Sequence, residues 1–269
     1  MQFSILIAHY NNWNYFQECY QSIKSQTIQD YEIIIVDDCS TDGSFYQLLE
    51  LTKLDSKLKL FQNPENKKVG YTKKKCVEEA QGKICFFVDP DDFLAPNALS
   101  EIAEAYNDNP NIIATYSRIE LIDTQSKSKG LFNKTKKIEN KKSNFFNINF
   151  EIAHLFSFKK EAYEKTSKIN ETLTSAVDQD LYLKLYELGN FYFINKVQYY
   201  YRIHDKGVSQ NQSQKEKLNK NWHQVILDTC KRRNIQKLYS KNISQINNLP
   251  DFIYKKENTF LKKVLKRIL

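Results

Sequence analysis

The chain is poor in cysteine, glycine and proline, and it has no long apolar run. Its 269 residues include 5 cysteines, 6 glycines and 5 prolines. The odd number of cysteines and the absence of a CxxC spacing argue against a disulfide framework or a zinc site, so we expect reduced thiols in a cytoplasmic protein. No stretch approaches 18 apolar residues, and the N-terminus runs straight into a predicted strand. We therefore expect neither a transmembrane helix nor a signal peptide.

Negative charge is scarce only at the end of the chain. The net charge is +8, but residues 215–269 hold 14 Lys and Arg against 4 Asp and Glu, while residues 1–214 hold 26 against 28. A near-neutral body with clustered acidic residues argues against a nucleic-acid partner. Hydrophobic residues make up 41% of the chain, which excludes global disorder.

The first half alternates short apolar runs with amphipathic segments. The runs Ile33–Val36 and Ile84–Val88 are too short for membrane spans and are rich in strand formers, so they predict buried parallel strands. The full pattern predicts strands at 3–8, 31–36, 57–62, 84–88, 111–116 and 117–123, and helices at 15–26, 44–54, 70–81 and 97–107. This alternation predicts an α/β fold with a mostly parallel central sheet flanked by helices.

The second half is less regular. Residues 124–147 are rich in Lys, Ser and Asn and lack periodicity, so we expect a mobile loop. Later patterns predict strands at 152–158, 191–195 and 199–203 and helices at 161–166 and 178–188, with a basic helical region from about residue 213.

Two acidic clusters directly follow predicted strands: Asp37-Asp38 and Asp89-Pro90-Asp91-Asp92. In parallel sheets, ligands bind outside the carboxyl ends of the strands. Carboxylates without a nearby Cys or His cluster suit a hard cation and a phosphate-bearing ligand. Taken alone, the first pair is equally well explained as a capped turn before a helix, whereas a helix cap explains only one aspartate of the second cluster.

The segment FSILIAHYNNWNYFQECYQSIKSQTIQDYEIIIVDDCSTDGS resembles the opening of family 2 glycosyltransferases of the GT-A fold. Further matching pieces follow in the expected order: Gly70 with a basic helix, FVDPDDFLAPNAL, VDQDLYLKLYELG and YYYRIHDKGVS. The resemblance covers roughly residues 1–210. It implies a Rossmann-like GT-A domain there, with a nucleotide-sugar half at 1–116 and an acceptor half at 117–210, followed by a helical basic extension at 211–269.

The resemblance places the nucleotide pocket at the ends of the first two strands. Tyr10 can stack on the base, and Asp38 can accept a hydrogen bond from N3–H of uracil, which favours a UDP-sugar over a purine donor. The implied lining residues are Ala8, Tyr10, Asn11, Asp37 and Asp38.

The second acidic cluster looks like the DxD motif of the family, with Pro90 included in the binding segment. A Mn²⁺ or Mg²⁺ ion there would bridge the two phosphates of the donor. The resemblance implies that Asp91 is the direct metal ligand. Asp89 and Asp92 would support the ion or contact the ribose and the sugar.

Asp178 opens a predicted helix where the family carries a Glu-Asp pair, so the resemblance implies that it is the general base of a single inverting displacement. Val177 replaces the usual Glu, and Asp180 is a second candidate. A simpler explanation of Asp178 is a favourable charge at a helix N-terminus.

Three basic residues are also implied in nucleotide-sugar binding. Lys74 matches an Arg position and would contact the diphosphate or Asp89, although a solvated helix face explains it equally well. Arg202 and His204 match a Tyr-Arg-x-His element, and His204 would reach the diphosphate or the metal.

These expectations combine into a non-processive enzyme that moves one sugar from a UDP-sugar to a hydroxyl of a glycan acceptor, in lipooligosaccharide, capsule or other surface polysaccharide synthesis. The (Q/R)xxRW element of processive synthases is missing. One alternative is a nucleotidyltransferase, which should carry a Gly-rich loop where His9-Tyr10-Asn11-Asn12 stands. Another is a catalytically silent scaffold at the membrane, which Val177 and Lys74 favour.

The last residues place an apolar stripe opposite basic side chains. The stripe comprises Phe260, Leu261, Val264, Leu265, Ile268 and Leu269, and the basic residues are Lys262, Lys263, Lys266 and Arg267. Such a helix suits the anionic inner face of a cell membrane, where a lipid-linked glycan would be the acceptor. Packing of the stripe on the body or on a second subunit is an equal alternative, which leaves an oligomer open.

Overall fold

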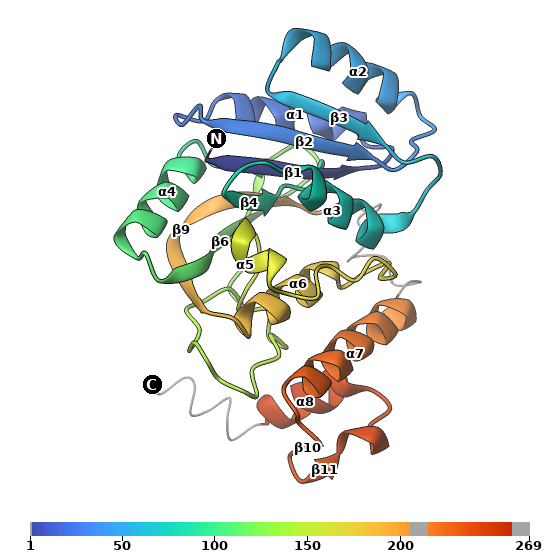
Figure 1. Cartoon of the computed structure of the whole chain (residues 1–269), viewed down its shortest axis with the longest axis vertical. Coiled ribbons are helices and arrows are strands. Elements are labelled where there is room, and N and C mark those ends of the chain that lie inside the picture. Colours follow the sequence, from blue (N-terminus) through green and yellow to red (C-terminus); the bar gives the residue numbers. More distant parts are fainter. Residues whose placement is uncertain (1, 205–214, 260–269) are drawn as a thin grey trace.

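The structure is a computed structural model that describes residues 2–204 and 215–259 (Figure 1). One large sheet forms its centre. Its strands are β1 (Phe3–His9), β2 (Tyr31–Asp37), β3 (Leu58–Gln62), β4 (Ile84–Phe87), β5 (Phe93–Leu94), β6 (Ile112–Ile122), β7 (Ser128–Leu131), β8 (Ser157–Lys159) and β9 (Asn190–Arg202). The helices are α1 (Trp13–Lys24), α2 (Ser44–Leu54), α3 (Lys68–Glu79), α4 (Ala98–Asp108), α5 (Lys160–Glu164), α6 (Val177–Tyr186), α7 (Lys215–Arg232) and α8 (Leu249–Glu257).

The strands follow the order β3-β2-β1-β4-β8-β6-β9-β5 across the sheet. The first four are parallel to one another, β8 is antiparallel to both of its neighbours, and β6 is parallel to β9. The predicted α/β class is confirmed, because the N-terminal half is a parallel sheet with a helix after each of β1, β2 and β3. The carboxyl ends of β1, β2 and β4 consequently lie along one edge (Figure 1).

Alternate residues of β1 enter two separate apolar cores, as the two-residue period of a strand requires. Ile5 and Ile7 pack with residues of α1 and α4. Leu6 packs on the other face with residues of α3 and α6. The sheet is therefore covered on both sides, which explains why its central strands are apolar throughout.

Two predictions for the second half are wrong in detail. The strands expected at 111–116 and 117–123 form one continuous strand, β6, and those expected at 191–195 and 199–203 form the single strand β9. The pairing of β6 with β9 contains register shifts. The segment expected to be a mobile loop, 124–147, contains β7, which pairs with β6, and its Phe146 is buried. Tyr116 fixes the same segment, since its hydroxyl donates to the carbonyl of Lys136 and accepts from the amide of Ile138.

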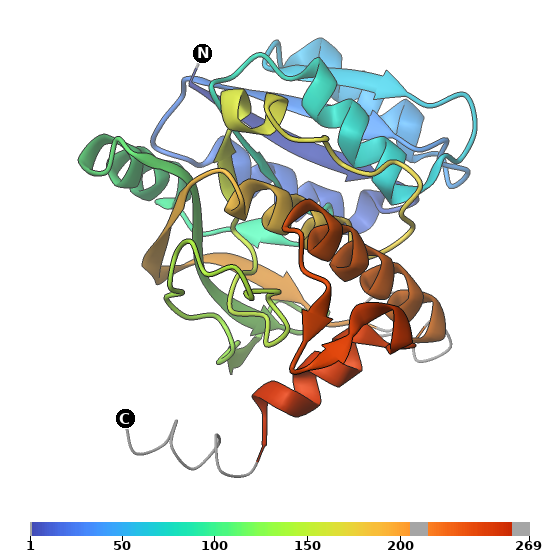
Figure 2. The ribbon, with the colours of Figure 1, turned by 60° about the horizontal axis from the view of Figure 1, so that its bottom comes forward.

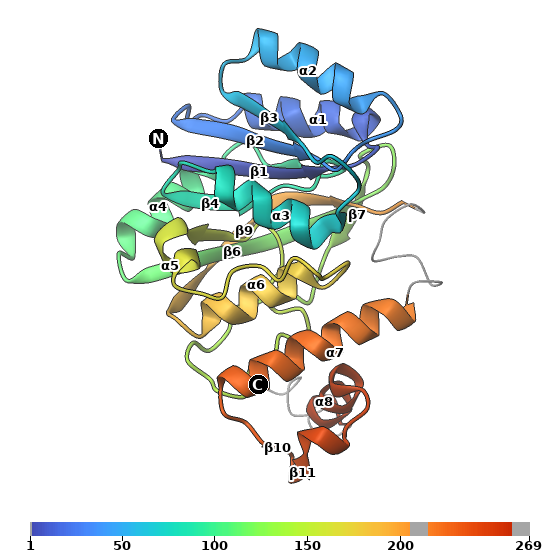
Figure 3. The same cartoon turned by 45° about the vertical axis from the view of Figure 1, so that its right-hand side comes forward.

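The C-terminal helices pack on the rest of the molecule at the end opposite to β3 and α2 (Figure 3). A third apolar core joins α7, α8 and the small hairpin of β10 (Lys237–Leu238) and β11 (Lys241–Asn242) to Phe146 and Ile148. Figure 2 shows this part beside the segment that precedes β8. The predicted division at residue 210 stays a prediction, and the amphipathic stripe at 260–269 lies outside the described residues. Within 2–204 and 215–259, no helix has the length and apolar character needed to cross a bilayer.

Candidate active site

The turn after β2 is built around Asp37. This fully buried carboxylate accepts hydrogen bonds from Nδ1 of His9 (3.1 Å), from the backbone and hydroxyl of Ser40 (2.9 and 2.5 Å) and from Gln62 (3.3 Å). Burial by itself would raise the pKa of Asp37, but the bonds from His9 and Ser40 outweigh it and lower the pKa below its ordinary value. The structure thus uses Asp37 to hold the turn, and its expected place in the lining of the nucleotide pocket stays a prediction.

Asp38 ties the β2 edge to the start of α3. Its Oδ1 accepts from Nδ2 of Asn63 and from the amide of Lys67, both at 2.8 Å, and its Oδ2 accepts from the amide of Lys68 at 2.9 Å. A carboxylate has about four acceptor positions. These three bonds leave Oδ2 able to accept one more, which is compatible with the expected contact to uracil.

Tyr10 and Asn11 follow β1 at the same edge. The ring of Tyr10 is 45% exposed, so it is open to a stacking partner. Asn11 has φ 50° and crosses to the β2 turn, where its side chain accepts from the amide of Thr41 at 2.8 Å. Ala8 is partly buried near the end of β1 and pairs with Val36. The structure therefore brings Ala8, Tyr10 and Asn11 to the same sheet edge as Asp38.

Asp91 and His204 meet at the second acidic cluster. Nε2 of His204 lies 2.7 Å from Oδ2 of Asp91, and its ring packs on Tyr15 at a centroid distance of 5.3 Å. Burial and the neighbouring Asp89 raise the pKa of Asp91, and the contact with His204 opposes them. An additional positive charge at this point would therefore stabilise the carboxylate.

Asp92 and Arg202 hold the turn of the second acidic cluster in place. The amide of Arg202 donates to Oδ1 of buried Asp92 at 2.8 Å, and burial next to Asp91 raises the pKa of Asp92 well above its ordinary value. The buried guanidinium of Arg202 donates to the carbonyls of Asp91 and Asp123 and forms an ion pair with Glu18. Arg202 is thus a brace within the protein, and its expected contact with the nucleotide sugar stays a prediction.

The predicted base, Asp178, lies beside a buried lysine. Nζ of Lys73 is 2.9 Å from Oδ1 of Asp178 and 3.2 Å from Oδ1 of Asp89, and Nε2 of His154 is 3.8 Å from the other oxygen of Asp89. Burial opposes ionisation of Asp178, but the charge of Lys73 outweighs it and lowers the pKa of the carboxyl. The two carboxylates raise the pKa of Lys73 in turn, against the effect of its burial.

The close approach of α3 to the segment before α6 positions Lys73. The amide of Gly70 donates to the carbonyl of Leu173 at 3.0 Å, and a Cβ at residue 70 would lie only 2.4 Å from that oxygen. Glycine is therefore required here by space, since any side chain would push the two segments apart.

Lys73 and His154 were not predicted from the sequence. Only one signal for Lys73 was available: it lies three residues before Cys76 on the buried face of the helix, where a lysine needs a charged partner. His154 belongs to no recognisable motif.

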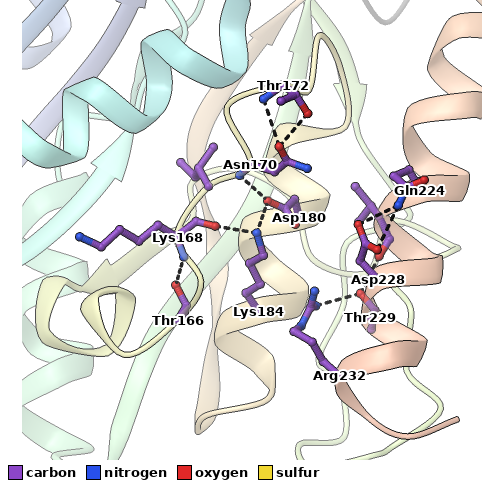
Figure 4. A network of polar contacts seen from close by, with 12 residues as sticks. Thr166, Lys168, Asn170, Thr172, Asp180, Lys184, Gln224, Asp228, Thr229 and Arg232 are labelled. Atoms are coloured by element: carbon purple, nitrogen blue, oxygen red, sulfur yellow. Dashed lines mark hydrogen bonds and ion pairs between the residues drawn. The ribbon is translucent and has the colours of Figure 1, made fainter.

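Two expected residues lie elsewhere. Lys74, expected to reach Asp89, pairs instead with Glu171 at 2.6 Å on the outer side of α3, so the neighbouring lysine makes the predicted contact. Asp180, the second candidate for the base, is buried against Lys184 at 2.7 Å and accepts from the amide of Asn170 at 2.9 Å (Figure 4). Its side chain is only 4% exposed, against 31% for Asp178, which makes Asp178 the more accessible of the two carboxylates.

The residues present fit a divalent cation that is held largely by its ligand. Within the described part of the chain, no three His, Cys, Asp or Glu side chains are grouped to hold a metal ion. A cation at Asp91 would therefore take most of its ligands from phosphate oxygens and water, as Mg²⁺ and Mn²⁺ do in many phosphate sites.

Comparisons with known proteins show the family and the fold. A family model described as glycosyl transferase family 2 matches residues 4–167, which is more than half of the chain. Chondroitin synthase of Escherichia coli is 28% identical over 263 residues, covering 94% of this chain and 36% of that protein. Chondroitin synthase of Pasteurella multocida is 26% identical over 97% of this chain and 26% of its own length. The chain thus spans about a third or less of these relatives.

Among solved structures, S. aureus TarS 1–349 in complex with UDP-GlcNAc superimposes with a TM-score of 0.71 at 19% identity, covering 98% of this chain and 78% of that one. The complex of the same TarS fragment with UDP gives a TM-score of 0.67 at 20% identity, covering 100% of this chain and 75% of the other. At this level of identity, the likeness shows a shared fold. It confirms the expected GT-A architecture.

Proposed function

The chain belongs to glycosyl transferase family 2, and from this membership we propose that it transfers a sugar from a UDP-sugar to a hydroxyl group of a glycan acceptor with inversion at the anomeric carbon. One observation carries the proposal: Lys73 joins Asp178, the candidate base, to Asp89 of the DxD turn through contacts of 2.9 and 3.2 Å. A base for the acceptor and a site for the donor phosphates are thus next to each other.

Donor binding is assigned to the edge formed by β1, β2 and β4. The exposed ring of Tyr10 offers a stacking surface for the base, and Oδ2 of Asp38 retains acceptor capacity for uracil. The structural neighbour bound to UDP-GlcNAc supports a UDP-sugar as donor. The choice of sugar depends on loops that no single residue identifies.

The proposed reaction is a single displacement. The acceptor oxygen attacks the anomeric carbon, the bond from that carbon to the diphosphate oxygen breaks, UDP leaves with the electron pair, and the hydroxyl proton passes to Asp178. Lys73 keeps Asp178 deprotonated before the reaction, since its positive charge lowers the pKa of the carboxyl. The part of the Asp178 side chain that is exposed, 31%, is the part that an acceptor can reach.

A divalent ion bound at Asp91, with Asp89 and His204 beside it, would neutralise charge on the leaving diphosphate. The chain's own contribution there is the DxD turn, which Arg202 fixes through the carbonyl of Asp91 and the carboxylate of Asp92.

The product and the location are proposals as well. Relatives named as chondroitin, hyaluronan and teichoic acid synthesising enzymes support a role in polysaccharide synthesis. A cytoplasmic site of action, a peripheral contact with the membrane through the C-terminal tail and a lipid-linked acceptor follow from the same proposal. The described residues add nothing to Val177 and Lys74 in favour of the silent scaffold, and they add nothing in favour of a nucleotidyltransferase.

A screen of UDP-sugars with Mn²⁺ or Mg²⁺ tests the proposal, with UDP release and the glycan product both measured. Asp178→Asn should lower kcat about 100- to 10,000-fold, because it removes the base and keeps the shape of the side chain. Asp108→Asn, at the end of α4, is a matched control that should retain activity. Full activity of Asp178→Asn would show that another group takes the proton. Lack of transfer from every UDP-sugar by the unmodified protein would contradict the function itself.

A further inference from the structure

Two aromatic residues from distant parts of the sequence meet beside residues that bond to the segment carrying the base, and they have no task in the reaction proposed above. Trp222 also packs against two of the apolar cores. The rings of Phe150 and Trp222 lie 5.2 Å apart between centroids, and both residues are partly exposed. Phe150 lies in the segment before β8, and Trp222 lies on α7.

Both residues are tied to the loop that presents Asp178. Asn147, three residues before Phe150, donates from Nδ2 to Oε1 of Gln179, the residue that follows the base, at 2.9 Å. Asn221, next to Trp222, donates from Nδ2 to the hydroxyls of Thr174 and Ser175 at 3.0 and 2.8 Å. The aromatic pair is therefore held against both sides of the segment that carries the candidate base.

Two further features distinguish this pair from ordinary core packing. Phe150 has φ 58°, a left-handed conformation that is rare for a bulky residue and that recurs where proteins clamp ligands. The indole nitrogen of Trp222 is buried and has no hydrogen-bond partner in the described part of the chain, although such groups usually find one.

Positive charge lies over the same surface. Nζ of the exposed Lys134 is 5.1 Å from the centroid of the Phe150 ring. The surrounding segment 132–142 carries five lysines, at positions 134, 136, 137, 141 and 142, and one acidic residue, Glu139. A ligand with negative charge would be favoured there.

We propose that Phe150 and Trp222 form the subsite for the acceptor, with a sugar ring packed on the aromatic faces and a carboxylate or phosphate of the acceptor bound by Lys134. The inference rests on the proposed function, because it takes Asp178 as the base. A hydroxyl must come within about 2.6–3.2 Å of that carboxylate to lose its proton. Groups fixed to both flanks of Asp178 are the ones able to hold it there, and aromatic walls with a few polar groups are typical of small-ligand sites.

The variant Phe150→Gly tests the aromatic part, because glycine adopts positive φ without strain and so the substitution removes the ring without disturbing the backbone. We expect the KM for the acceptor to rise about tenfold or more, the equivalent of one good contact, while the KM for the UDP-sugar changes less than about twofold. Trp222→Leu should act in the same direction. Tyr239→Gly is a matched control, since Tyr239 also has positive φ (48°) and packs on an aromatic ring, that of Phe252.

Three acceptor probes test the charged part: a hexasaccharide of alternating uronic acid and N-acetylhexosamine, a neutral N-acetylhexosamine hexamer and an oligo(glycerol phosphate). We expect one of the two anionic probes to be preferred over the neutral hexamer, which identifies the source of the charge. Lys134→Gln should reduce that preference, and Lys237→Gln, on exposed β10, should not.

Equal use of neutral and anionic probes, or an unchanged acceptor KM in Phe150→Gly, would overturn the inference. Should the unmodified protein release no UDP from any UDP-sugar, the proposed function fails separately. Saturation-transfer NMR with the same three probes then decides the subsite alone: signals lost in Phe150→Gly and kept in Tyr239→Gly support it, and signals equal in both refute it.

Discussion

Replacing Lys73 by methionine should move the acidic limit of activity to higher pH. Methionine keeps most of the length of the side chain and its packing near the ring of Phe87, which the ammonium group approaches to 5.0 Å from the centroid, but it removes the charge. Asp178 and Asp89 then lose the cation that lies 2.9 and 3.2 Å from them. The pKa of Asp178, now held below its ordinary value, should rise.

The size of the change follows from the geometry. An opposite charge within about 4–6 Å lowers a carboxyl pKa by about 1–3 units, and each unit corresponds to about 1.4 kcal/mol. Because burial opposes ionisation of Asp178 and no longer has a counterweight, the pKa of Asp178 should rise above its ordinary value. The base is active only when deprotonated. The acidic limit of activity should therefore lie about 1–3 pH units higher in Lys73→Met than in the unmodified enzyme.

The assay is the pH profile of kcat/KM for transfer between pH 5 and 9. Lys73→Arg keeps the charge and should keep the acidic limit of the unmodified protein, although with lower activity. Lys74→Met is a matched control on the exposed side of the same helix, where the lysine pairs with Glu171, and it should leave the profile unchanged. The reasoning is refuted if the acidic limits of Lys73→Met and the unmodified protein coincide.

Three further outcomes are expected. Asp91→Asn should abolish the rise in Tm that UDP and Mn²⁺ together produce. The Tm of the free protein should stay equal or increase, because burial and Asp89 raise the pKa of Asp91 and so disfavour its charged form in the fold. Glu32→Gln should flatten the pH dependence of stability, which urea unfolding at pH 7 and pH 4 can measure. The pKa of Glu32 is lowered because bonds from Lys59 and Ser4 outweigh the effect of its burial. The carboxylate therefore stabilises the fold above pH ~4.3, and this contribution is lost as the pH falls through the lowered pKa. Arg202→Met should cost about 1–3 kcal/mol of unfolding free energy, because it leaves the carbonyls of Asp91 and Asp123 without their buried donor and removes the brace of the turn. A loss below about 0.5 kcal/mol would contradict the brace.

The sequence was sufficient for the parallel half of the fold because its strands are apolar on both faces. Ile33, Ile34 and Ile35 are all fully buried, so neither register nor face had to be inferred. The strands of the other half are harder to predict from a pattern. In β9, Asn195 and Lys196 interrupt the apolar residues and resemble a turn, yet the strand continues through a register shift against β6. Long-range pairing thus outweighed local composition.

The candidate site also has a part that could be predicted from the sequence and a part that could not. Residues at strand ends, such as Tyr10, Asp38 and Asp91, could be predicted because the topology of a parallel sheet places them at one edge. Lys73 was missed in favour of Lys74 because the sequence does not state which of three successive lysines faces inward. That choice depends on the contact of Gly70 with the carbonyl of Leu173, which fixes the rotation of α3.

The base is the part of the site that depends on the most distant contacts. Asp178 is held by Lys73 from α3, its neighbour Gln179 is held by Asn147, and the loop before it is held by Asn221 on α7. Lys73 also contacts Asp89 at the strand edge that binds the donor in the proposed function, whereas Asn147 and Asn221 come from other parts of the chain. The base is therefore coupled to the donor site through Lys73, and α7, a helix that follows the last strand of the sheet, takes part in placing the loop before the base. Asn221 links α7 to the loop before the base through its bonds to Thr174 and Ser175. A shift of α7 would strain or break these bonds, so the positions of α7 and of the base are coupled.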